Sequence, residues 1–201
     1  ALASRMDMLI LQDTSLPDLL NEAEWQMLSA AMQARGMPPV MGAKMQPWYV
    51  SMLLAVPTCL QTALQERAGL DARLEALADQ SGVPTAALES FDTAFDAFGS
   101  VPLDMQVSML LASLTEPQVN VDLFETMLGG YFDETHAEIQ MVLERLSPRL
   151  TPLDEAESAA VFDMMDEALI VSRNAAWIPV ILEAAREVEG PIVAAFGAAH
   201  L

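Results

Sequence analysis

The fold that the sequence predicts is decided by its last twelve residues, Gly190-Pro191-Ile192-Val193-Ala194-Ala195-Phe196-Gly197-Ala198-Ala199-His200-Leu201. Gly190-Pro191 ends the preceding helix, and Ile192–Phe196 is a short apolar run typical of a buried strand. Gly197 allows the backbone to turn sharply after this strand. The turn is expected to bring His200 to the mouth of a β-sheet.

Two apolar runs upstream have the same character. Met6–Leu11 and Val83–Leu88 both predict short strands, and helical patterns punctuated by glycine and proline fill the chain between and after them. The longest helix is expected to start at Thr151 and to continue through Pro179 to Ala185. Residues 120–146 are also predicted to be helical, with a break at Gly129-Gly130.

These elements predict an α/β, helix-rich fold. Tight hairpin signals such as Asn-Gly are missing from the sequence, so the strands should pair in parallel through helical crossovers. We expect one domain over residues 1–201, with a small parallel or mixed sheet and a large helical insertion at roughly 15–185. Because a parallel sheet is normally covered on both faces, we also expect the domain to be incomplete at both ends.

The composition narrows the range of functions. The 201 residues include 29 Asp and Glu against nine Lys and Arg, a net charge of −20, which excludes a nucleic-acid partner bound through clustered cations. The chain is 53% hydrophobic, too apolar for a disordered acidic protein. No apolar run free of charge and proline reaches the ~20 residues of a membrane span. A single cysteine, Cys59, excludes an internal disulfide.

Polar side chains follow the predicted strands. Gln12 and Asp13 follow the first, Glu89 the second and His200 the third. In an open α/β sheet, ligands bind beyond the carboxyl ends of the strands, and imidazole with carboxylates is a metal-binding combination. The plainer alternative is that His200 is a loop histidine and Glu89 a carboxylate favoured at a helix N-terminus.

Arg173-Asn174 is a second candidate, because arginine is scarce in this chain and this one lies within a largely apolar helix. A buried arginine there needs a carboxylate or a ligand as its partner. The alternative is an exposed Arg173 that pairs with Glu167 or Asp166.

The ordered landmarks resemble the TraB/GumN family, which includes the TIKI-type metalloproteases. The resemblance is carried, in chain order, by six segments: Met6 to Asp13, Gln46-Pro47-Trp48, Gly69-Leu70-Asp71 with Leu74 and Ala78, Pro84 to Ser90, Arg173-Asn174-Ala175-Ala176-Trp177, and Phe196-Gly197-Ala198-Ala199-His200-Leu201.

The resemblance implies an α/β core with a helical insertion and a divalent-metal site built from two Gly-x-x-His motifs and a strand-end glutamate. His200 matches the second of these histidines and would be a ligand of Mn²⁺, Co²⁺ or Zn²⁺. The first Gly-x-x-His would lie before Ala1. Arg173, Asn174 and Glu89 match polar family positions and are the expected catalytic residues.

Several positions depart from the family pattern. Gln12 stands where the strand-end glutamate is expected, and its uncharged amide is a poor metal ligand and no general base. Ala94 replaces a frequent glutamine, and the segment after Tyr131 lacks the usual Gly-Asp pair. We expect Gln12, Asp13, Gly197 and Tyr131 to line the substrate cleft, and Gln12 argues for reduced or lost activity.

Three functions follow from the sequence. The first is a metal-dependent, peptidase-like hydrolase, and the second is a catalytically degenerate member that binds a peptide or a small molecule. The third is a helical interaction domain whose acidity serves solubility or a basic partner. The resemblance favours a periplasmic or other extracytoplasmic location and leaves a cytoplasmic one open, while the oligomeric state and the substrate are not encoded in any motif here.

Overall fold

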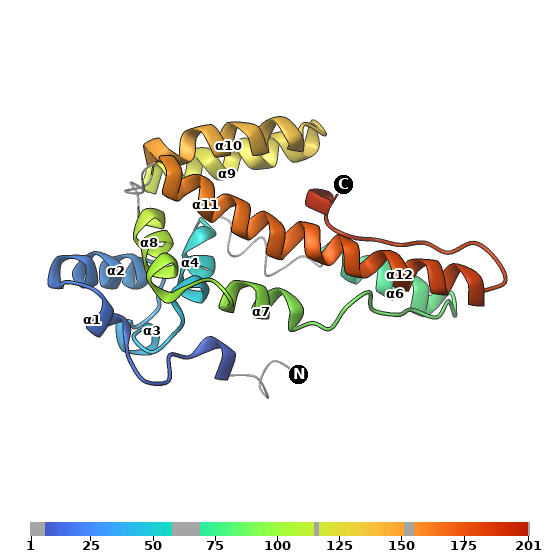
Figure 1. The fold of residues 1–201 in the computed structure, drawn as a ribbon, viewed down its shortest axis with the longest axis horizontal. Helices are drawn as coiled ribbons and strands as arrows, with labels where there is room; N and C mark the ends of the chain where they lie inside the picture. The colour runs from blue at the N-terminus through green and yellow to red at the C-terminus, as the bar shows by residue number, and fades with distance from the viewer. Residues whose placement is uncertain (1–6, 58–68, 115–116, 151–154, 201) are drawn as a thin grey trace.

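The computed structural model describes residues 7–57, 69–114, 117–150 and 155–200. Within these ranges the chain consists of helices and irregular segments, without a strand or sheet. The elements, labelled in Figure 1, are α1 (Leu16–Leu19), α2 (Glu22–Ala34), α3 (Pro39–Gly42), α4 (Pro47–Ala55), α6 (Leu70–Gln80), α7 (Thr93–Gly99), α8 (Leu103–Ser113), α9 (Pro117–Phe132), α10 (His136–Leu150), α11 (Glu155–Asp166), the π-helical turn η2 (Glu167–Val171), α12 (Ser172–Glu187) and the 3₁₀ turn η3 (Ala198–His200).

The predicted α/β fold with a small sheet is therefore wrong for the described residues. The first predicted strand forms a 3₁₀ turn at residues 7–9 and one isolated antiparallel bridge between Ile10 and Met45. The second and third, at 83–88 and 192–196, are irregular, and Val193 is 91% exposed. A short apolar run indicates a preference for burial, but a sheet also needs a neighbouring strand, which the described residues do not supply.

The apolar core lies at one end of the molecule, where α1, α2, α4 and α8 gather (Figure 1). Helix α2 begins with a capping box, in which Asn21 and Glu24 satisfy each other's backbone N–H groups, and it stops before Gly36, whose φ of +73° suits glycine. The buried residues of this core are Leu11, Leu16, Leu20, Leu28, Met32, Val50, Leu54 and Leu110.

Helices α9 and α10 form an adjacent hairpin. The predicted break at Gly129-Gly130 is wrong, because α9 continues to Phe132. The structure gives Gly130 another role: a Cβ built there would lie 2.3 Å from Cγ1 of Ile139 on α10. The missing side chain thus lets the two helices approach closely.

The long C-terminal helix is confirmed in its described part, which runs through α11, η2 and α12 with Pro179 inside α12. Thr151, its expected start, lies outside the described residues. After α12 the chain turns back, and residues 191–197 run beside α12 toward η3 (Figure 1). The contact of Phe196 with Trp177, at 6.0 Å between ring centroids, ties this returning segment to α12.

By length and composition, one helical stretch of the described residues is able to cross a membrane, Ala159–Glu187. A single stretch of this kind is weak evidence for a span. It includes Arg173, which is engaged in the ion pair described below.

Candidate functional site

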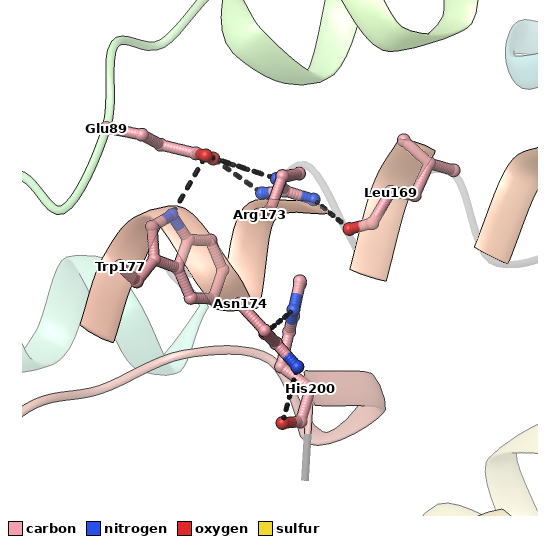
Figure 2. A network of polar contacts seen from close by, with 6 residues as sticks. All are labelled: Glu89, Leu169, Arg173, Asn174, Trp177 and His200. Carbon is pink, nitrogen blue, oxygen red and sulfur yellow. Dashed lines mark hydrogen bonds and ion pairs between the residues drawn. The ribbon is translucent and has the colours of Figure 1, made fainter. Parts of the chain in front are cut away.

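The centre of the candidate site is a carboxylate held by two residues of α12. Arg173 donates from Nε to both oxygens of Glu89, at 3.1 and 3.2 Å, and from Nη2 to Oε1 at 2.6 Å. Trp177 donates from Nε1 to the other oxygen, Oε2, at 2.9 Å (Figure 2). This arrangement joins the segment after α6 to α12, across 84 and 88 residues of sequence.

Helical geometry explains how α12 presents both donors. Arg173 and Trp177 are four residues apart and therefore lie on the same face of the helix. The π-turn before them fixes the arginine further: Arg173 Nη1 donates to the Leu169 carbonyl at 2.9 Å. Ser172 closes this turn, because its N–H and its Oγ both donate to the Glu167 carbonyl.

The electrostatics of this pair favour the charged form of the carboxyl. The hydrogen bonds from Arg173 lower the pKa of Glu89 below its usual range, partial burial opposes this, and the Trp177 hydrogen bond lowers it again. The two side chains retain only 18% and 22% exposure, so solvent screens the pair incompletely. Glu89 is thus a fixed anion at neutral pH.

The candidate imidazole, that of His200, is held in place by Asn174 on α12. His200 Nδ1 lies 2.8 Å from Asn174 Oδ1, and Asn174 Nδ2 donates to the His200 carbonyl at 3.4 Å (Figure 2). Because that carbonyl can only accept, the amide nitrogen must face it, and Oδ1 must face Nδ1. The proton of the neutral ring therefore sits on Nδ1, and Nε2 carries the lone pair.

Trp177 lies between the two halves of the site, the Glu89–Arg173 pair and the Asn174–His200 pair. Its ring centroid is 4.4 Å from that of His200, and the Arg173 guanidinium carbon is 5.0 Å from its ring centroid. Burial lowers the pKa of His200, the positive charge of Arg173 lowers it further, and Glu89 opposes both by raising it. The imidazole is therefore kept neutral to lower pH than an exposed histidine.

Comparison with known families identifies the chain. The TraB/PrgY/gumN family model matches residues 1–201. The chain belongs to this family. Neither the search of curated proteins nor the search of solved structures found a match.

The structure brings together all four of the predicted catalytic and metal residues of this TraB-family chain, which are Glu89, Arg173, Asn174 and His200. Gly197, predicted to line the cleft, directly precedes η3, and its carbonyl accepts from the His200 N–H at 3.0 Å. Arg173 pairs with Glu89, not with Glu167 or Asp166, the sequence-local alternatives.

The remaining predicted cleft residues lie elsewhere. Gln12 and Asp13 are exposed in the segment before α1, which lies well apart from the C-terminal turn in Figure 1. The Gln12 amide donates to carbonyls of its own segment, those of Asp7 at 3.5 Å and Ile10 at 3.3 Å. Tyr131 lies on α9, 56% exposed, with its ring against Phe132.

The sequence prediction did not include Trp177 among the site residues, although it is the residue that touches both halves. Its spacing of four from Arg173 was the available signal, because that spacing puts both side chains on one helix face. The contact of Arg173 with the Leu169 carbonyl could not be predicted, since the residue pattern does not indicate a π-turn.

His200 has the arrangement expected of a single metal ligand. Its Nδ1–H is anchored by Asn174, which leaves Nε2 for coordination, as in many metal-binding histidines. Glu89 fits less well, because Arg173 and Trp177 occupy both of its oxygens. No group of three His, Cys, Asp or Glu that could hold a metal ion occurs among the described residues. They therefore supply one fitting ligand and not a complete set.

Proposed function

We propose that this TraB-family chain is a metal-dependent hydrolase of peptide-like substrates, with its reacting centre at Nε2 of His200. The observation that carries the proposal is the double contact with Asn174, which fixes both the tautomer and the direction of the ring. An unprotonated Nε2 at neutral pH is what a metal ligand or a general base requires.

The contacts favour different roles for the two charged residues. Glu89 is a positioning anion, because its oxygens are already engaged and its pKa is lowered. Arg173 holds that anion through two of its five N–H groups and donates a third to the Leu169 carbonyl. One N–H on each terminal nitrogen is therefore left to reach a substrate oxygen. Such donors stabilise negative charge that develops on a carbonyl oxygen.

A divalent ion such as Mn²⁺, Co²⁺ or Zn²⁺, when bound at His200, would act as a Lewis acid toward the substrate carbonyl and toward water. The chain's own contributions are separate from that chemistry. Asn174 orients the imidazole, and Trp177 shields one side of it from water. Arg173 keeps the Glu89 charge balanced.

The test uses the full-length protein and compares the two histidines of residues 1–201, with His200→Ala as the variant and His136→Ala as the matched control. Bound metal is measured after dialysis against Mn²⁺, and turnover is followed with quenched fluorescent peptides. We expect His200→Ala to lose bound metal and turnover and the control to retain both. Equal metal content and equal turnover in both variants would rule out the proposal.

A second candidate function is binding without cleavage, in an extracytoplasmic member of the family that recognises a peptide or a small molecule. It is favoured by Glu89, which is locked in an ion pair and unsuited to proton transfer, and by the described residues, which supply one fitting metal ligand and not a complete set. Peptide binding and peptide turnover, both measured on the wild type, distinguish the two functions. Binding without turnover supports this second function, whereas turnover that His200→Ala abolishes rules it out.

A further inference from the structure

Among the described residues, Trp177 contacts both the Glu89–Arg173 pair and the Asn174–His200 pair. Its Nε1–H donates to Glu89 Oε2 at 2.9 Å, and its ring lies 4.4 Å from the His200 ring. It is also 6% exposed, and no other described side chain of α12 is buried. The position of the His200 ring is therefore coupled, through Trp177, to the position of the Glu89 carboxylate.

The two contacts use different parts of the indole. The N–H group holds the carboxylate, and hydrogen bonds to charged groups are stronger than those between neutral groups. The ring face packs against the imidazole, and the Arg173 guanidinium lies over the same ring, at 5.0 Å from its centroid. Because the parts are distinct, substitutions can remove one function and keep the other.

We propose that Trp177 is a positioning residue: its Nε1–H fixes the Glu89 carboxylate, and its ring fixes the imidazole of His200 in the orientation that keeps Nε2 open. This inference adds a residue to the function proposed above. Of its two tests, only the kinetic one rests on that proposed function. Asn174 determines which nitrogen of His200 is protonated, whereas the indole ring of Trp177 packs against the imidazole and limits its rotation.

The chain contains a matched control in Trp48. This tryptophan is also 6% exposed and stacks on Phe98 at 5.4 Å, but its Nε1 is buried and has no hydrogen-bond partner among the described residues. Trp48→Phe therefore makes the same change of side chain as Trp177→Phe without removing a hydrogen bond. A general effect of losing one indole would appear in both variants.

The kinetic arm uses full-length protein with Mn²⁺ and a quenched fluorescent peptide. We expect Trp177→Phe to lower kcat about tenfold with KM unchanged, because a charge-assisted hydrogen bond is lost while the ring is kept. Trp177→Leu should lower kcat further, since it removes the ring as well. Equal kcat values for Trp177→Phe and Trp48→Phe would overturn the role of the N–H group.

The second arm needs no turnover. The ring nitrogens of ¹⁵N-labelled histidine report which one carries the proton, and His136 serves as the internal reference. We expect His200 to keep its Nδ1–H form in wild type and in Trp177→Phe. In Trp177→Leu we expect a mixture of forms, because without the indole ring the imidazole is free to turn away from Asn174 Oδ1. An unchanged Nδ1–H signal in Trp177→Leu would overturn the inference. If wild type and His200→Ala turned over peptide equally, the proposed function would fail while this spectroscopic test still decided the role of Trp177.

Discussion

The core end of the molecule and the long C-terminal helix are held together by different kinds of contact. Around α2, α4 and α8, fully buried side chains such as Leu28 and Leu110 pack against each other. Along α12 only Trp177 is buried among the described side chains, and Glu89, Arg173 and His200 join distant segments through polar contacts. The comparison teaches that stability and the candidate site are located in different parts of this chain, and each prediction below tests that separation.

The largest effect is expected from cavity formation in the core. Leu28→Ala removes a side chain with 0% exposure and should cost about 3 kcal/mol of unfolding free energy. The matched control is Leu182→Ala on α12, where the leucine is 50% exposed and the change should stay within about 0.5 kcal/mol. Urea unfolding measures both, and a similar loss in the two variants would contradict the separation.

A smaller effect is expected from the ion pair. A double-mutant cycle with Arg173→Met and Glu89→Gln should give a coupling energy of about 1 kcal/mol, because the two side chains share several hydrogen bonds and are partly shielded from water. Urea unfolding of wild type, the two single variants and the double variant supplies the four values. Strictly additive losses would mean that the pair adds nothing to the fold.

The pH dependence of the same pair should be smaller still. The folded-state pKa of Glu89 is lowered from its ordinary value of 4.5, so its stabilisation is fully present above that value and is lost as the pH falls through the lower, folded-state pKa. The stability difference between wild type and Glu89→Gln should therefore be constant near neutrality and shrink below about pH 4.5. A difference that grew on acidification would contradict this sign.

The smallest stability effect is expected at the π-turn. Ser172→Ala removes hydrogen bonds to Glu167 of 2.6 and 3.0 Å, but alanine has the higher helix propensity, so unfolding free energy should change by no more than about 0.5 kcal/mol. Because the turn also holds Arg173, we expect faster amide exchange at 167–173 and a lower kcat. Unchanged exchange in this segment would separate Ser172 from the site.

Local patterns in the sequence predicted the helices better than the strands. The stop at Gly36 follows from the backbone preference of a single residue, which acts locally. The helix continues through Pro179 although proline is disfavoured inside helices, because the apolar and polar pattern on either side is helical. The strand prediction at 192–196 failed because an apolar run specifies its own tendency to be buried and not the presence of a partner strand.

The residues of the site could be predicted because they match polar positions of the family. The contacts between these residues could not be predicted. Glu89 and Arg173 are 84 residues apart, so no periodicity relates them, and the sequence offered closer acidic residues as partners. The sequence alone does not mark Trp177 as a site residue, because a tryptophan on an apolar helix is ordinarily part of a core. Only the fold reveals that its one polar atom faces a carboxylate.

The π-turn η2 also sets the angular phase of the long helix. The hydrogen bond of a π-turn spans one residue more than that of an α-helical turn. Each residue of an α-helix advances the side chains by about 100° around the axis. The face of α11 that meets α10 and the face of α12 that meets Glu89 are therefore offset by this extra rotation. In this sense a single inserted residue determines the direction in which Arg173, Asn174 and Trp177 point, and the length of the segment 167–171 matters as much as its composition.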